Sequence, residues 1–152
     1  MELIHTSPAE ITSIHMHGRF NEFLFFSDSE YVMTAGTHFA YKIEVSDDSI
    51  IEAGRLFHHE DASKLAVLVA KLATRLGIDA DAAEALIEES VSIFDIDSNV
   101  EAEDLADASW DIQLFTARAA KLLGFRGVEV SDEQGTSYMI DMLGRELELV
   151  KA

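Results

Sequence analysis

The sequence contains no cysteine and a single proline, and its eight glycines are scattered along 152 residues. The absence of cysteine excludes disulfide frameworks, thiolate nucleophiles, zinc ribbons and iron–sulfur sites together. The scarcity of proline and the scatter of glycine leave no evident linker, and there is no internal repeat. With 48% apolar residues, the chain is expected to form one domain over residues 1–152 with its own core.

Long hydrophobic runs are also missing. No stretch approaches the roughly 20 apolar residues needed to span a bilayer, and the N-terminus lacks the basic, apolar and small-residue order of a signal peptide. These features predict a soluble protein of the cytoplasm.

Basic residues are few, because 11 Lys and Arg stand against 29 Asp and Glu, which gives a net charge of −18. Such a chain repels phosphate backbones and anionic membranes, so direct binding to nucleic acid or membrane is not expected. The same charge favours association with a basic protein surface, such as one that holds DNA or RNA. Acidity that only maintains solubility is the alternative.

Two periodicities divide the chain. Alternating or continuous apolar runs predict strands at Glu2–His5, Phe20–Phe26, His38–Val45, Ile50–Leu56 and Glu146–Val150. Helical spacing predicts three helices in the middle: one from Ala62 to Gly77, a second with a capping box at Asp81 and Glu84, and a third from Glu103 to Leu123. Ser7, Pro8 and Glu10 indicate a brief helix through Ile14. Strands, then helices, then strands predict an α+β fold.

The stretch Phe125–Met142 places two acidic residues between a pair of strands. Val128 and Val130 alternate with polar neighbours before Ser131–Gly135, and Thr136 to Met142 alternate after it, so the segment reads as two strands joined by a loop. Asp132 and Glu133 lie in that loop. A carboxylate at the end of a strand pair is held in a fixed direction, which makes these two acids the leading catalytic candidates.

Familiar nucleotide and hydrolase motifs do not occur. There is no G-x-G-x-x-G, no Walker loop, no G-x-S-x-G and no H-E-x-x-H. His15 and His17, and the run His58 to Asp61, lack the spacing of a known metal site and are interpreted as surface histidines. No metal is expected.

His5 follows an apolar strand and precedes Thr6 and Ser7. Together with the aromatic segment FLFFSD and the loop SDEQGT, it resembles the ADP-ribosyltransferases of the diphtheria-toxin and poly(ADP-ribose) polymerase type. The resemblance is stronger to anti-CRISPR proteins with this fold that inhibit type I-F surveillance complexes. It is carried by HTSPAEITSI, by GRFNEFLFF and above all by LGFRGVEVSDEQGTSYM, and it spans nearly the whole chain.

The resemblance implies an ADP-ribosyltransferase fold, with split antiparallel or mixed sheets around a helical middle segment, and NAD as the donor. His5, with Thr6 and Ser7 beside it, would contact the NAD ribose. Phe25 or Phe26 would stack near nicotinamide, and Asp132 would be catalytic. Thr6 replaces a glycine common in the wider superfamily, and a phenylalanine replaces the usual tyrosine. Asp132 and Glu133 face opposite ways on an extended segment, so the choice between them stays open.

The implied chemistry gives each residue a reason. Cleavage of the bond between nicotinamide and ribose develops positive charge at the sugar carbon, as in glycoside hydrolysis. A fixed carboxylate stabilises that charge and orients the acceptor. The hypothesis is therefore an NAD-dependent mono-ADP-ribosyltransferase that modifies the PAM-recognising, DNA-binding subunit of a type I-F complex. The alternatives are a non-enzymatic acidic DNA mimic and an ADP-ribosylating toxin with another target.

Overall fold

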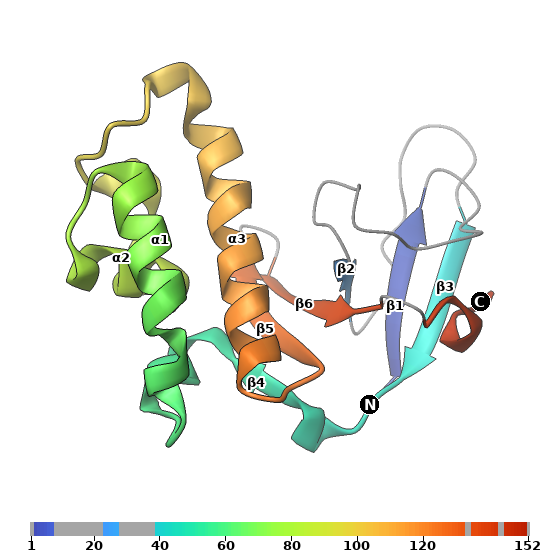
Figure 1. Cartoon of the computed structure of the whole chain (residues 1–152). Helices are drawn as coiled ribbons and strands as arrows, with labels where there is room; N and C mark the ends of the chain where they lie inside the picture. The colour runs from blue at the N-terminus through green and yellow to red at the C-terminus, as the bar shows by residue number, and fades with distance from the viewer. Residues whose placement is uncertain (1, 8–22, 28–38, 133–134, 143–144, 152) are drawn as a thin grey trace.

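The computed structural model describes residues 2–7, 23–27, 39–132, 135–142 and 145–151. Within them the chain forms two sheets and a helical segment that lies between β4 and β5 in the sequence (Figure 1). The predicted α+β class is confirmed. The brief helix expected after Ser7 falls on residues 8–14, which lie outside the described ranges.

The two sheets differ in strand number and direction. The first is antiparallel, with the strand order β1 (Glu2–Ser7), β3 (Phe39–Glu44) and β7 (Val150–Lys151). The second has the order β2 (Phe23–Phe26), β6 (Gly135–Asp141), β5 (Gly127–Asp132) and β4 (Ile50–Glu52). It is mixed, because β4 runs parallel to β5 while the other neighbours are antiparallel.

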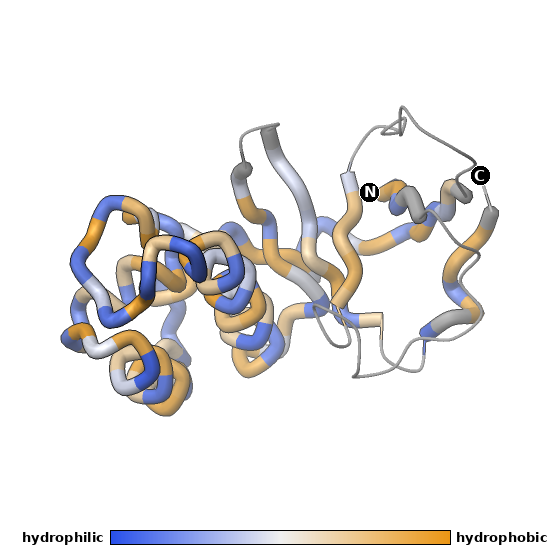
Figure 2. The backbone as a smooth tube through the Cα atoms, turned by 90° about the horizontal axis from the view of Figure 1, so that it is seen from above, coloured by the Kyte–Doolittle hydropathy of each residue, from blue (hydrophilic) through white to orange (hydrophobic). Residues whose placement is uncertain are grey.

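Each face of the four-stranded sheet covers a different core. On one face Val128, Val130 and Met139 pack under the helices. These are α1 (Ala66–Leu76), α2 (Ala80–Ile87) and α3 (Leu105–Leu122). On the other face the second core joins the two sheets, with Leu3, Phe26, Ile43, Val45, Tyr138, Ile140 and Met142. Figure 2 shows hydrophobic and hydrophilic stretches alternating along the helices, as expected where only one side of each is buried.

The helices follow the predicted apolar stripes. Leu68, Val69 and Leu72 of α1 are buried, and the helix ends at Gly77, whose φ of 65° is left-handed. The cap of α2 was predicted two residues too late. Asp79, rather than Asp81, accepts a hydrogen bond from the backbone N of Ala82 at 2.7 Å.

Polar contacts connect the helices. Thr116 of α3 is 1% exposed and donates to the backbone oxygen of Ile87, the last residue of α2, at 2.7 Å. The end of α2 is thereby fixed against α3. At the end of α3, Leu122 is 43% exposed, and the next residue, Leu123, is buried instead.

Several predicted strands differ from the structure, and β1 runs two residues further than expected, to Ser7. Only Ile50–Glu52 of the segment Ile50–Leu56 is a strand, and a 3₁₀ helix covers Ala53–His58. The loop expected at Ser131–Gly135 is shorter, because β5 continues to Asp132 and β6 begins at Gly135. The prediction of one strand over Glu146–Val150 is wrong. A 3₁₀ turn occupies Glu146–Glu148 and leaves Leu147 99% exposed.

No helix among the described residues is long and apolar enough to cross a membrane.

Candidate active site

His5 lies where the two sheets meet. It pairs with Tyr41 within the three-stranded sheet. The neighbouring residue Ile4 makes an isolated antiparallel bridge to Ser27, at the end of β2, through two backbone hydrogen bonds of 2.8 Å. The bridge sets β1 beside the edge strand of the four-stranded sheet. An imidazole on β1 is therefore held against β2 by main-chain geometry.

The ring of His5 has a defined orientation and proton position. Its Nδ1 lies 2.5 Å from the carbonyl oxygen of Phe25. A carbonyl only accepts, so Nδ1 carries the hydrogen. Burial lowers the pKa of His5 below its ordinary value of 6.5, although the hydrogen bond to Phe25 acts in the opposite direction. The neutral ring therefore presents Nε2 as an acceptor.

The two phenylalanines of β2 face opposite sides of the sheet. Phe26 is 2% exposed, belongs to the core between the sheets, and its ring centroid lies 5.5 Å from that of His5 at 53°. Phe25 is half-buried and packs at the margin of the helical core. The ring of Phe26 thus packs against the imidazole of His5 from the core side. Phe25, in contrast, is only half-buried. The stacking role predicted for one of them stays a prediction.

The backbone of the β5–β6 hairpin brings Asp132 to the same end of the sheet as β2. Phe26 pairs with Tyr138 of β6. Asp132 pairs with Gly135, which precedes Tyr138 by three residues in the same strand. With strands about 4.8 Å apart and about 3.3 Å per residue, the Cα atoms of Phe26 and Asp132 are separated by about 14 Å. Phe26, whose ring lies against that of His5, and Asp132 therefore lie at the same end of the four-stranded sheet.

The remaining predicted site residues are described in part or not at all. Thr6 and Ser7 continue β1, and Asp132 ends β5, but the structure describes only the backbone of these three residues. Glu133 lies outside the described residues. The assignments of these four side chains stay predictions.

The predicted surface histidines were also placed in part. His58 is exposed, and His59 is half-buried with its ring 5.6 Å from that of Phe125 in an edge-to-face contact. The Nδ1 of His59 accepts a hydrogen bond from the backbone N of Asp61 at 3.0 Å. Among the described residues no group of three metal-ligating side chains occurs. His15 and His17 lie outside the described ranges.

A depression of about 700 Å³ lies beside β4, at the opposite edge of the four-stranded sheet from β2. Its lining includes Ile51, His59 and Phe125 together with Asp47, Asp48 and Glu52. It contains none of the predicted site residues, so we assign it no part in the reaction.

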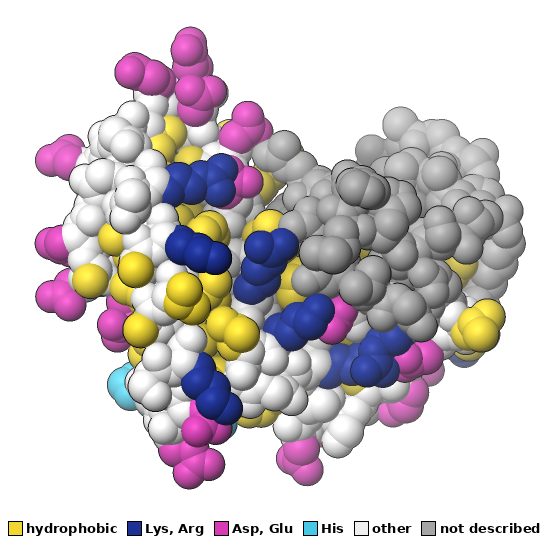
Figure 3. Space-filling model, viewed as in Figure 1, with side chains coloured by type: hydrophobic (Ala, Val, Ile, Leu, Met, Phe, Trp, Pro, Cys, Tyr) yellow, Lys and Arg dark blue, Asp and Glu magenta, His cyan; other side chains and the backbone are white. Residues whose placement is uncertain are grey.

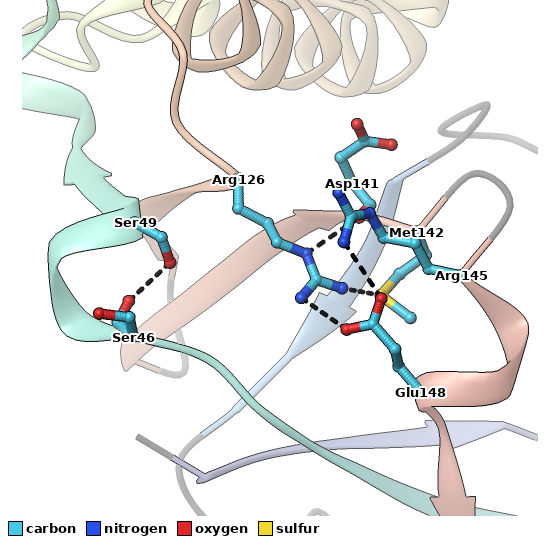
Figure 4. A network of polar contacts seen from close by, with 7 residues as sticks. All are labelled: Ser46, Ser49, Arg126, Asp141, Met142, Arg145 and Glu148. Carbon is cyan, nitrogen blue, oxygen red and sulfur yellow. Dashed lines mark hydrogen bonds and ion pairs between the residues drawn. The ribbon is translucent and has the colours of Figure 1, made fainter.

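The sequence patterns did not indicate a role for Arg126. This residue directly precedes β5, and its side chain binds the C-terminal segment (Figure 4). Its side chain is 15% exposed, and its Nη1 lies 2.8 Å from the Oε1 of Glu148. Its Nη2 approaches the Sδ of Met142 at 3.3 Å, and its backbone N donates to the oxygen of Ser49. Glu148 is in turn held by Arg145 at 3.1 Å. These contacts stabilise the turn that replaces the predicted last strand, and β7 after it pairs with β3.

We expect Arg126→Met to lower the free energy of unfolding by about 1.5–3 kcal/mol, the usual range for hydrogen bonds to charged groups. Arg145 binds the same carboxylate but is 48% exposed, so Arg145→Met should cost about 0–1 kcal/mol. Urea unfolding of both variants and the wild type measures the difference. Equal losses would show that burial does not distinguish the two arginines.

The lowered pKa of His5 has a consequence for stability. The imidazole of the unfolded chain takes up a proton at a higher pH than that of the folded protein, so the folded state loses stability as the pH falls from 6.5 through the folded pKa. We expect the free energy of unfolding to fall more between about pH 7.5 and pH 5.5 in the wild type than in His5→Asn. The carboxylates titrate in both proteins and cancel in the comparison. An equal fall in the two would contradict the expected shift.

Charge is distributed unevenly over the surface. Neither α1 nor the part of α3 from Ile112 to Leu122 contains an acidic residue. On the face where these helices lie, Figure 3 shows a band of Lys and Arg with hydrophobic side chains among them, and most Asp and Glu at its outline. Two of the basic residues are paired, Arg75 with Asp111 and Lys121 with Asp141.

The comparisons with known proteins point to one family. A family model described as Anti-CRISPR Type I-F ADP-ribosyltransferase AcrIF11 matches residues 2–146, a range that includes every predicted site residue. Among solved structures, a crystal structure of an anti-CRISPR protein is 28% identical, with a TM-score of 0.60 and coverage of 92% of this chain and 88% of that one. No curated protein matches the chain.

Proposed function

The chain belongs to the anti-CRISPR type I-F ADP-ribosyltransferase family, and from this we propose that it modifies the PAM-recognising subunit of a type I-F surveillance complex and so blocks binding of target DNA. Membership makes it an NAD-dependent ADP-ribosyltransferase directed against a CRISPR complex. The subunit and the mode of inhibition are our proposal. The observation that carries it is the match of the family model to residues 2–146, a range that holds both His5 and the β5–β6 hairpin.

The choice of target follows from charge. A subunit that grips the PAM duplex presents Lys and Arg to phosphates and bases, and a chain with a net charge of −18 is attracted to such a surface. ADP-ribose carries a pyrophosphate, so its attachment adds negative charge where DNA must bind. Repulsion of the DNA backbone would then persist after the enzyme has left.

His5 and its neighbours fit the ribose end of the donor. The Nε2 of a neutral, half-buried imidazole would accept a hydrogen bond from a sugar hydroxyl, and its Nδ1 contact with Phe25 would fix the direction of that bond. Thr6 and Ser7 follow on the same strand and would contribute main-chain contacts. Phe25 would offer the accessible part of its ring to nicotinamide. Phe26 would act from below, by holding the imidazole in place.

Asp132 would supply the charge that the reaction needs. NAD provides an activated glycosidic bond whose cleavage leaves positive charge at the sugar carbon. A carboxylate fixed at the end of β5 stabilises that charge without reorganising, and it can hold the ribose hydroxyl and the acceptor side chain in line. Glu133 would assist or replace it only if the hairpin tip turned that side chain toward the donor.

The proposal is tested by incubating the chain with a type I-F surveillance complex in the presence and absence of NAD. We expect an intact-mass increase of one ADP-ribose on the PAM-recognising subunit, and loss of DNA binding only where NAD was added. Inhibition by stoichiometric protein without NAD would instead support an acidic DNA mimic. Modification of another protein, with the complex left unmodified, would support a toxin-like transferase.

A further inference from the structure

The three helices end in the same left-handed backbone conformation, but one of them does so without glycine. Gly77 follows α1 with a φ of 65°, and Gly124 follows α3 with a φ of 92°. After α2 the corresponding residue is Glu89, with a φ of 64°. A residue with a Cβ occupies this region at a cost of about 1 kcal/mol or more relative to glycine. The position therefore favours glycine on backbone grounds alone.

The turn at Glu89 is a regular helix end. The backbone N of Glu89 donates to the oxygen of Leu86 at 3.2 Å, and the N of Ser90 donates to the oxygen of Ala85 at 2.9 Å. These are the two hydrogen bonds of a Schellman-type helix end, which glycine usually makes. The backbone gives no reason for a glutamate, so the reason must be sought in its side chain.

The side chain of Glu89 reaches the strand that carries Asp132. Its Oε1 accepts a hydrogen bond from the backbone N of Ser131 at 3.1 Å, across 42 residues of sequence. The neighbouring strand β4 ends at Glu52, opposite Glu129, and does not extend to Ser131. The carboxylate of Glu89 thus supplies the acceptor that a longer β4 would have provided at the end of β5.

The end of α2, from which the side chain of Glu89 extends, is fixed by contacts of its own. Ile87 is fully buried, and its carbonyl oxygen is bound by the buried hydroxyl of Thr116 on α3 at 2.7 Å. Glu89 follows two residues later in the tight turn. Two hydrogen bonds therefore connect α3 through α2 to the end of β5. The bond from Thr116 to Ile87 is buried, and the bond from Ser131 to Glu89 is exposed.

We propose that Glu89 is a positioning residue of the transferase site, which fixes the last residues of β5 and hence the place of Asp132 relative to His5. This role rests on the proposed function of Asp132. Glu89 acts through the main chain of Ser131 and does not touch the donor. Glu89 belongs to the helical middle segment, in which the sequence analysis identified no site residue.

Three substitutions at this position separate a positioning role from a purely structural one. Glu89→Ala removes the contact and keeps the backbone strain, while Glu89→Gly removes the contact and relieves the strain. Glu89→Gln keeps an acceptor oxygen of the same reach. We expect kcat for NAD-dependent modification to fall on the order of tenfold in the Ala and Gly variants, with KM for NAD within about twofold and Gln close to wild type.

Stability should move differently from activity. Glu89→Gly should melt at a higher temperature than Glu89→Ala, because glycine adopts the left-handed turn without strain, yet it should be equally slow. Amide hydrogen exchange at Ser131 should be faster in both variants than in the wild type, and this readout needs no activity.

The outcomes are distinguishable. Wild-type kcat in Glu89→Ala, or recovery of kcat in Glu89→Gly, would overturn the positioning role alone, as would unchanged exchange at Ser131. A wild-type chain that modifies nothing in the presence of NAD would overturn the proposed function, and the positioning role would fall with it.

Discussion

Asp132→Asn is expected to lower the rate of NAD-dependent ADP-ribosylation by about 10²–10³-fold, the loss typical when one preorganised group that stabilises transition-state charge is removed. The amide has the shape of the carboxylate but no negative charge to place beside the sugar carbon. Because Asp132 is the last residue of β5, we expect the folded state to be little affected. Intact-mass kinetics on the modified subunit measure the rate, and a thermal melt checks the fold.

Glu133→Gln is the matched control for Asp132→Asn. It removes one charge from the neighbouring position of the same hairpin, so it reproduces any effect of net charge on association with a basic target. We expect its rate within about threefold of the wild type, since the loss of one charge from a chain with a net charge of −18 alters association only modestly. If Glu133→Gln were the inactive variant and Asp132→Asn the active one, the two assignments would have to be exchanged.

The local elements could be predicted because they follow from short-range patterns. Val128 and Val130 alternate with polar residues, and both valines are buried on one side of the strand that contains them. Leu68 and Leu72 lie at helical spacing, and Gly77 ends their helix in the left-handed conformation that glycine adopts most readily. In each case the residues that determine the structure are within one or two turns or strand repeats of one another.

The site depends on longer distances and was predicted through family resemblance. His5 contacts Phe25 across 20 residues, and Phe26 pairs with Tyr138 across most of the chain. Alternation shows that Phe25 and Phe26 face opposite ways, but not which of them lies under the imidazole. That choice depends on the Ile4 to Ser27 bridge between the sheets, for which neither strand carries a local signal.

Arg126 and Glu89 were missed because charged residues are usually solvent-exposed and carry no pattern that marks a structural role. Arg126 and Glu89 are charged residues of an acidic chain, where any one of them is ordinarily a solvated side chain. Arg126 differs in being mostly buried, which no pattern of its neighbours indicates. Glu89 did leave a trace in the sequence, because the helix it follows lacks the glycine that ends the other two. In other proteins too, a helix that ends in the left-handed conformation without glycine or asparagine indicates a residue whose side chain is worth examining.

Phe26→Ala is expected to lower the free energy of unfolding by about 3–5 kcal/mol, the usual cost of emptying a buried aromatic site. Phe26 is 2% exposed and packs with Leu3 and Ile43 between the sheets, where little collapse is possible. The cavity would also open beneath the ring of His5, 5.5 Å away. Affinity for NAD should therefore fall together with stability, as measured by calorimetric titration below the melting temperature and by urea unfolding.

Phe26→Leu separates these two effects. Leucine fills most of the same space and should cost about 1–2 kcal/mol, so the variant stays folded, but it offers the imidazole no aromatic face. If the ring of Phe26 orients His5, Phe26→Leu will bind NAD more weakly than the wild type at a temperature where both are fully folded. Phe25→Leu, on the same strand but half-buried, should be less destabilising and should affect NAD binding only through the stacking role. Unchanged affinity in Phe26→Leu would reduce Phe26 to a core residue and leave the Phe25 carbonyl as the contact that orients His5.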